Sequence, residues 1–134
     1  MIKWLLDTDT CIGIIKRQPP AAIRKLTSKS VGQVGISAIT LSELEYGASR
    51  SGRPDAARAA LSEFLLPLIV APFDSRAAQA YGPVRAALEK LGQPIGPLDT
   101  LIAAHALSLD TVLVSHNLRE FRRIPELRVE DWLK

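Results

Sequence analysis

Short apolar segments alternate along the chain with longer segments in which apolar residues recur at helical spacing. The short segments have the length and composition of buried strands, and the longer ones are typical of helices packed on one face. Strands are predicted at residues 2–6, 33–37, 68–71 and 111–115, with 127–130 as a candidate fifth. Helices are predicted at residues 8–17, 20–28, 38–49, 55–66, 75–91 and 99–109.

This alternation predicts an α/β fold with a central, mostly parallel sheet of four to five strands flanked by helices on both faces. Prolines mark some of the boundaries. Pro19 and Pro20 separate the first two helices, and Pro83 predicts a kink or a split within residues 75–91. In sheets of this kind, ligands bind beyond the carboxyl ends of the strands. Residues that directly follow strands are therefore the first candidates for function.

The composition favours one domain covering residues 1–134. Apolar residues make up 47% of the chain, enough to bury a core without disulfides, and the single cysteine, Cys11, excludes an internal disulfide. No apolar run approaches the roughly 20 residues that cross a bilayer, and the N-terminus lacks a signal-peptide pattern. We therefore expect a cytoplasmic protein with no membrane contact. The net charge of +3 is compatible with a polyanionic partner but does not identify one.

Three acidic residues occupy the positions that this topology makes important. Asp7 ends the first predicted strand, Glu43 lies in the helix after the second strand, and Asp99 opens the most apolar helix. Carboxylates gathered at one edge of a sheet repel each other, and a divalent cation removes that cost. Oxygen ligands of this kind suit Mg²⁺ or Mn²⁺. Such a metal can orient a phosphodiester and activate water.

Each of these acids also has a purely structural interpretation. Asp7 and Asp9 are ordinary N-cap residues for the helix that follows. Thr40 and Glu43 have the spacing of a capping box. Asp99 would favour the positive end of its helix dipole. The shared location of the three acids at one edge of the sheet supports the metal-site interpretation, and Glu45, two residues beyond Glu43, should face solvent.

Further polar residues follow the fourth predicted strand. Ser115, His116 and Asn117 would add hydroxyl, imidazole and amide groups at the same edge. His105, within the apolar helix, is better explained as a packed histidine, and neither histidine has zinc-site spacing. Three arginines come next, which either contact phosphates or remain as solvated surface charge: Arg119, Arg122 and Arg123.

With these residues in view, the chain resembles the PIN-domain ribonucleases, and within them the VapC toxins of VapBC toxin–antitoxin pairs. The likeness covers nearly the whole length, and the order and spacing of its motifs make it specific. The motifs are Leu5-Leu6-Asp7-Thr8-Asp9, Ser42-Glu43-Leu44 with Tyr46-Gly47, Pro97-Leu98-Asp99, Ser115-His116-Asn117 and Arg119-Glu120-Phe121.

The resemblance implies a PIN fold and a Mg²⁺- or Mn²⁺-dependent endoribonuclease. Such a protein is the toxin of a type II toxin–antitoxin system, cleaves structured RNA such as tRNA to inhibit translation, and is silenced by a cognate VapB-type antitoxin. A homodimer is also implied. Asn117 stands where many PIN domains carry a fourth acid. The implied catalytic residues are Asp7, Glu43, Asp99 and Asn117, with metal ligands Asp7, Asp99 and Glu43 and supporting residues Ser115 and Asp9.

Two other functions remain open at this point. Asp7-Thr8-Asp9-Thr10 looks like the nucleophile motif of haloacid-dehalogenase-type phosphatases, although their later acidic motif should follow Ser115, whereas Asp99 precedes it. The chain could also be a non-catalytic PIN-like module that binds RNA or a protein. The presence of all three acids argues against that second alternative.

Overall fold

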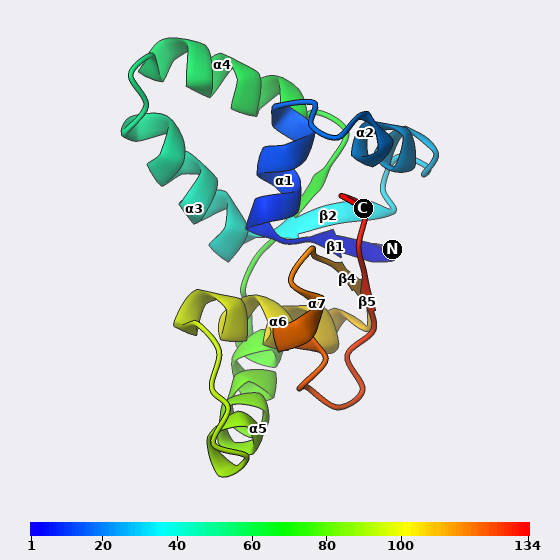
Figure 1. The fold of residues 1–134 in the computed structure, drawn as a ribbon, viewed down its shortest axis with the longest axis vertical. Coiled ribbons are helices and arrows are strands. Elements are labelled where there is room, and N and C mark those ends of the chain that lie inside the picture. Colours follow the sequence, from blue (N-terminus) through cyan, green and yellow to red (C-terminus); the bar gives the residue numbers. More distant parts are fainter.

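A five-stranded parallel sheet runs through the centre of the computed structural model, which describes residues 1–134 (Figure 1). The strand order is β3-β2-β1-β4-β5, so β1 is central, with β2 and β4 on either side. Every pairing is parallel. The predicted fold class is confirmed. The strands are β1 (Trp4–Leu6), β2 (Val34–Ser37), β3 (Ile69–Ala71), β4 (Val112–Val114) and β5 (Val129–Glu130).

Helices connect each strand to the next. Two helices lie between β1 and β2, two between β2 and β3, two between β3 and β4, and one short helix before β5. No helix is both long and apolar enough to cross a membrane. The helices are α1 (Thr8–Ile15), α2 (Pro20–Thr27), α3 (Ala38–Ser49), α4 (Pro54–Leu65), α5 (Ser75–Lys90), α6 (Pro97–Leu109) and α7 (Leu118–Phe121).

The sheet divides the hydrophobic core into two layers. Leu5 and Leu6 are adjacent in β1 and both fully buried, but they point to opposite faces, as successive strand residues must. Leu6 packs in the layer that contains Ile36, and Leu5 packs in the layer that contains Ile102 and Phe121. Figure 1 shows α1, α2 and α4 on one side of the sheet and α5, α6 and α7 on the other. Burial on both faces explains why the strands are continuously apolar.

Several element ends shift by one or two residues, such as that of α1 at Ile15. Three differences from the predicted elements have a clear physical cause. α5 continues through Pro83, so the predicted split is wrong; Pro83 is exposed, which leaves water free to satisfy the carbonyl that loses its partner. α6 begins at Pro97 rather than at Asp99, because proline is well suited to the first helical position. The one-turn helix α7 was not predicted, since Leu118–Phe121 is too short to show a helical period.

The C-terminal segment packs back onto the first core layer. Trp132 is buried, and its indole Nε1 donates a hydrogen bond to Glu130 at 3.1 Å. The ammonium of Lys29 lies 4.1 Å from the ring centroid of Trp4 and 5.8 Å from that of Trp132. A cation over two aromatic rings stabilises this corner. The end of the chain thus closes the face of the sheet that α1 and α2 cover.

Gly35 generates a stability prediction. A Cβ at this position in β2 would lie 2.7 Å from the carbonyl oxygen of Ile69 in the neighbouring strand, and 2.8 Å from the Cδ1 atom of Ile2. Because the carbonyl belongs to the sheet, it cannot move aside cheaply. We expect Gly35→Ala to lower the free energy of unfolding by about 1–3 kcal/mol, measured by urea denaturation.

Gly47→Ala is the matched control. Gly47 lies inside α3, where a Cβ would meet nothing within 4 Å. That substitution should raise the free energy of unfolding by roughly 0.5–1 kcal/mol, because alanine loses less conformational freedom in a helix than glycine. If Gly35→Ala were as stable as Gly47→Ala, the close contact between β2 and β3 would be wrong.

Candidate active site

Asp7 and Ser115 meet at the point where the order of the strands reverses. The chain moves from β1 to β2 and β3 in one direction, and then crosses back to place β4 on the other side of β1. Such a switch point opens a crevice at the carboxyl ends of the two strands. Asp7 directly follows β1 and Ser115 directly follows β4, and both are buried. The backbone N–H of Asp7 donates to the carbonyl of Val114 at 3.0 Å and ties the strand ends together.

The Asp7 carboxylate serves as the N-cap of α1. Its Oδ1 accepts a hydrogen bond from the backbone N–H of Thr10 at 2.9 Å. Burial raises the pKa of Asp7, hydrogen bonds from Ser115 and Thr10 lower it in part, and the nearby charge of Asp9 raises it again. The capping interpretation is therefore correct for Asp7. It does not exclude a second role, because a carboxylate has further lone pairs to offer.

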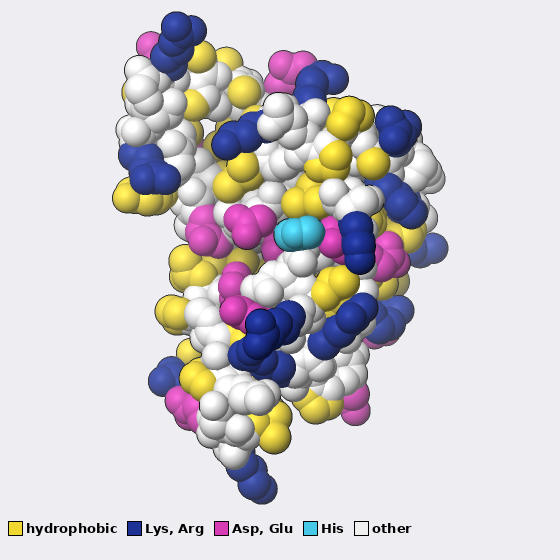
Figure 2. Space-filling view, in the orientation of Figure 1, with side chains coloured by type: hydrophobic (Ala, Val, Ile, Leu, Met, Phe, Trp, Pro, Cys, Tyr) yellow, Lys and Arg dark blue, Asp and Glu magenta, His cyan; other side chains and the backbone are white.

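Asp99 lies in the first turn of α6, and the charges of the other acids affect its pKa. Burial first, and then the charges of Asp7 and Glu43, raise its pKa to about 6. Glu120 and Asp9 add smaller effects of the same sign. None of the groups that shift this pKa is a cation. Figure 2 shows acidic side chains gathered across the middle of this face of the molecule. The negative charges of this acidic cluster thus act on Asp99 with no cation offsetting them.

Glu43 projects from α3 toward α1. The hydroxyl of Thr8 donates a hydrogen bond of 2.5 Å to Glu43 Oε1. The capping-box interpretation of Glu43 is wrong, because α3 begins at Ala38 and its N-cap is Ser37, whose side chain accepts from the N–H of Ile39. Thr40 lies inside the helix. Glu45 is exposed, as predicted.

A buried hydrogen bond joins the two helices that carry Glu43 and Asp99. Nδ1 of His105 in α6 lies 2.8 Å from the hydroxyl oxygen of Ser37, the residue that caps α3. The imidazole also packs edge-on against Phe73, with ring centroids 5.3 Å apart. Burial lowers the pKa of His105. The prediction of a packed histidine is confirmed, and His105 braces the two helices against each other.

Comparison with known proteins identifies the family. The sequence model of the PIN domain family matches residues 4–127 of this chain. The chain is 46% identical, over 98% of its length and 99% of the relative's, to the tRNA(fMet)-specific endonuclease VapC of Salmonella typhimurium. It is 40% identical, over 99% of its length and 100% of the relative's, to the ribonuclease VapC2 of Haemophilus influenzae. The chain belongs to the PIN-domain family, as a VapC-type member.

The fold of this PIN domain agrees with a solved structure of the same family. VapBC2 from Rickettsia felis, bound to a DNA fragment from its promoter, matches with a TM-score of 0.92 and 36% identity, covering 98% of this chain and 99% of that one. The resemblance seen in the sequence is confirmed. Membership of this family also decides against the phosphatase alternative.

The donor set of the PIN domain suits a hard divalent cation. Its acids offer carboxylate oxygens, which Mg²⁺ and Mn²⁺ prefer over nitrogen or sulfur. As the side chains stand, no three Asp, Glu, His or Cys residues are close enough to hold a metal ion together. The charges of Asp7 and Glu43 nevertheless reach Asp99 strongly enough to raise its pKa. A cation placed between them would relieve this repulsion.

Glu120 is an acid of the cluster that the sequence interpretation missed. It lies in α7, three residues after Asn117, and its charge contributes to the raised pKa of Asp99. Asn117 is the N-cap of α7, and its backbone N–H donates to the Ser115 hydroxyl oxygen at 2.9 Å. Predicting α7 would have revealed Glu120. In a helix that follows Asn117, residue 120 lies one turn further on, on the same side.

The remaining sequence candidates lie beside the acidic cluster. Arg119 and Arg122 are exposed, while Arg123 Nη1 lies 3.5 Å from the carbonyl oxygens of Gln93 and Pro94. Figure 2 shows basic side chains directly next to the acidic patch. His116 pairs with Asp131 at 2.9 Å.

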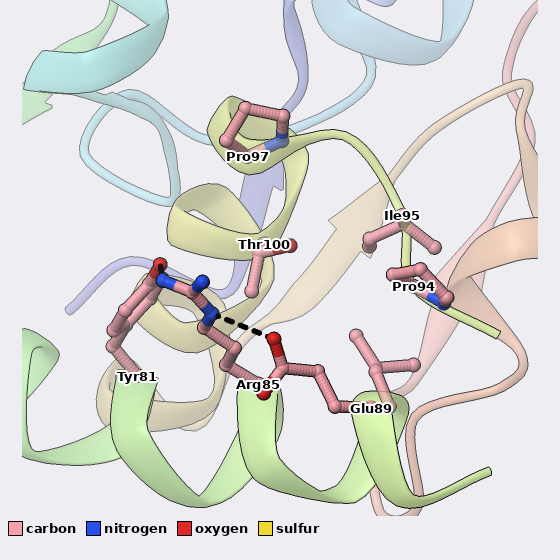
Figure 3. A pocket seen from close by; sticks show the side chains of 8 residues that line it. Tyr81, Arg85, Glu89, Pro94, Ile95, Pro97 and Thr100 are labelled. Atoms are coloured by element: carbon pink, nitrogen blue, oxygen red, sulfur yellow. Dashed lines mark hydrogen bonds and ion pairs between the residues drawn. The ribbon is translucent and has the colours of Figure 1, made fainter. Parts of the chain in front are cut away.

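A separate pocket of about 220 Å³ lies between α5 and the start of α6 (Figure 3). Its walls include Tyr81 and Arg85 of α5, the latter paired with Glu89 at 3.3 Å, together with Pro97 and Thr100 of α6. None of the acids of the cluster lines it. This pocket is therefore distinct from the candidate active site.

The raised pKa of Asp99 predicts how stability depends on pH. A carboxyl group whose pKa is higher in the folded than in the unfolded chain favours folding when it is protonated. Its contribution is full below the unfolded value, near 3.8, and is lost as the pH rises through about 6. We expect the urea concentration at the unfolding midpoint, measured in the presence of chelator, to decrease as the pH rises from about 3.8 to about 6. The Asp99→Asn variant should show a flatter dependence, and equal slopes for both proteins would contradict the assignment.

Proposed function

We propose that this PIN domain is a Mg²⁺- or Mn²⁺-dependent endoribonuclease that cuts structured RNA and acts as the toxin of a type II toxin–antitoxin pair. The observation that carries the proposal is the cluster of acids at the switch point of the sheet, where burial and the charges of Asp7 and Glu43 raise the pKa of Asp99 and no cation offsets them. Strongly perturbed carboxylates in a crevice are typical of functional sites.

The metal would be held by Asp7, Asp99 and Glu43. When bound, a divalent cation orients the phosphodiester, lowers the pKa of water and stabilises the leaving oxygen. Thr8 keeps Glu43 turned toward α1 through its hydrogen bond. Ser115 orients Asp7 through a hydrogen bond, and Asn117, the N-cap of α7, would offer a neutral oxygen. Glu120 is the better candidate for a fourth acid, because its charge reaches Asp99.

Transfer RNA is the proposed substrate class. The relative in Salmonella typhimurium is named as an endonuclease specific for tRNA(fMet) and is similar to this chain over nearly the whole length of both. The exposed arginines of α7 and the turn after it would contact phosphates on either side of the cut. Cleavage of a tRNA removes it from protein synthesis, which would explain inhibition of translation.

The proposed partner is an antitoxin of the VapB type, and the proposed assembly contains a homodimer of this chain. The similar protein from Rickettsia felis was solved as a VapBC complex. An uncompensated acidic cluster is a favourable seat for an arginine or lysine from another chain. An antitoxin that placed such a residue there would occupy the position proposed for the metal, and inhibition would follow.

The first prediction of this proposal concerns the acids. Asp7→Asn, Asp99→Asn and Glu43→Gln should each lower RNA cleavage by at least about 100-fold, because each removes a ligand charge. Cleavage by the wild type should require added Mg²⁺ or Mn²⁺ and stop in excess chelator. The measurement is the rate at which end-labelled tRNA is cut.

Glu45→Gln provides the matched control for Glu43→Gln. The two residues are two positions apart in α3, but Glu45 is exposed and does not shift the pKa of Asp99. Glu45→Gln should therefore cut at the wild-type rate. Cleavage that continues in chelator, or that survives Asp99→Asn, would refute the proposed centre. RNA binding without any metal-dependent cleavage would favour a non-catalytic binding module instead.

The second prediction concerns RNA affinity. Replacing Arg119, Arg122 and Arg123 together by alanine should weaken tRNA binding and reduce the slope of log K against log salt by roughly 2 to 3, since each phosphate contact contributes about 0.7–0.9. Binding is measured by fluorescence anisotropy between low and physiological salt. An unchanged slope would mean that these arginines do not contact RNA.

A further inference from the structure

A hollow of about 610 Å³ opens directly beside the acidic cluster. Thr8, Asp9 and Glu43 form the wall nearest the cluster, and Leu98, adjacent to Asp99, contributes from the start of α6. Tyr46 of α3 and Arg50, the residue that caps the end of α3, also line it. The hollow is therefore continuous with the residues proposed to hold the metal. Whatever lies in it would contact Glu43 and Leu98, the residue next to Asp99.

Tyr46 presents an aromatic ring to this hollow. Tyr46 is 67% exposed, which leaves ring surface free for a ligand to cover. Residues 43, 46 and 50 are spaced three and four apart, so they share one face of α3. The ring is thus held one helical turn from Glu43. Leu98, which is 43% exposed, adds a second apolar surface to the same hollow.

Arg50 gives the tyrosine a cationic neighbour. Its guanidinium carbon lies 5.6 Å from the centroid of the Tyr46 ring. No carboxylate pairs with Arg50, since the ion pairs of the chain are Arg85–Glu89, His116–Asp131 and Arg128–Asp110. An aromatic face beside an unpaired guanidinium matches the two parts of a nucleotide, which are a flat base and a charged phosphate.

We propose that Tyr46 and Arg50 form a nucleotide subsite that stacks an unpaired RNA base on the tyrosine ring and holds the adjoining phosphate with the arginine. The inference rests on the proposed ribonuclease function, and it goes further by naming residues that position the substrate. A base inside a duplex has no free face for such stacking. The subsite therefore selects RNA in which a nucleotide next to the cut is unstacked.

A segment of a partner protein is the competing occupant of this hollow. It would gain from apolar contacts with Leu98 and the body of Tyr46, but it has no need of an aromatic side chain in particular. RNA depends on the aromatic face itself and on the charge of Arg50. Replacing Tyr46 by leucine distinguishes RNA from a protein segment, because leucine keeps an apolar side chain and removes the π surface.

The test measures binding in an Asp7→Asn background, so that RNA is bound without being cut. The probe is an eight-nucleotide single-stranded RNA with 2-aminopurine at successive positions, whose fluorescence is quenched by stacking. Tyr46→Leu should weaken binding about 5- to 100-fold and abolish the quenching at one position. Tyr46→Phe should retain both. Arg50→Ala should weaken binding and lower the salt slope by about 0.7.

Arg53→Ala is the matched control for Arg50→Ala. Both arginines belong to the turn between α3 and α4 and are exposed, but Arg53 does not line the hollow. Arg53→Ala should leave the affinity unchanged. Thermal unfolding of each variant verifies that the fold is retained, which is expected because Tyr46 is exposed.

Tyr46→Leu binding the probe as tightly as the Asp7→Asn parent would overturn the subsite. The subsite would also be overturned if Tyr46→Leu lost affinity for the purified antitoxin but not for RNA. Tyr46 would then be a contact for a protein. Neither result affects metal-dependent cleavage by the wild-type chain, which is measured separately on tRNA. Failure of that cleavage, with the stacking signal intact, would reject the proposed nuclease and leave an RNA-binding site.

Discussion

The pairing of β4 with β1 is the interaction on which the candidate active site depends. β4 is reached only after the chain has built β2 and β3 on the opposite side, and two helices carry it back across the sheet. The carbonyl of Val114 then accepts hydrogen bonds from the N–H of Asp7 and the hydroxyl of Thr10. This pairing creates the switch point, brings Ser115 against Asp7 and completes both core layers. Without it, Asp7 would not lie beside Ser115 at the switch point.

The acidic cluster illustrates how stability and function compete in a small domain. Asp7 caps α1 and is buried, and both features tie a negative charge to the end of β1. Asp99 is brought close to it by α6, and no basic side chain is among the groups that shift its pKa. Proteins tolerate such local repulsion where the rest of the fold outweighs it. Here, two layers of buried apolar side chains on either side of a parallel sheet provide that excess.

The sequence was most informative where periodicity and topology agreed. The apolar strands predicted the parallel sheet. Residues following strands led to Asp7 and Glu43, and the start of the most apolar helix led to Asp99. Glu120 was missed because a single helical turn produces no detectable period. The capping box at Thr40 failed because capping-box spacing does not reveal where a helix starts, and Ser37 begins α3 instead. Tyr46 was noticed only as part of a motif, since exposure cannot be read from residue type. Long elements were predictable, whereas one-turn features and side-chain exposure required coordinates.

The hydrogen bond between His105 and Ser37 helps to fix the spacing between Glu43 and Asp99, although neither acid takes part in it. Ser37 fixes the start of the helix that bears Glu43, and His105 belongs to the helix that bears Asp99. Positions 37 and 105 are therefore expected to vary together among homologous chains. Anyone transplanting the acidic cluster onto another α/β scaffold would have to transfer this buried pair with it. The portable unit of the site is larger than the residues that would touch substrate.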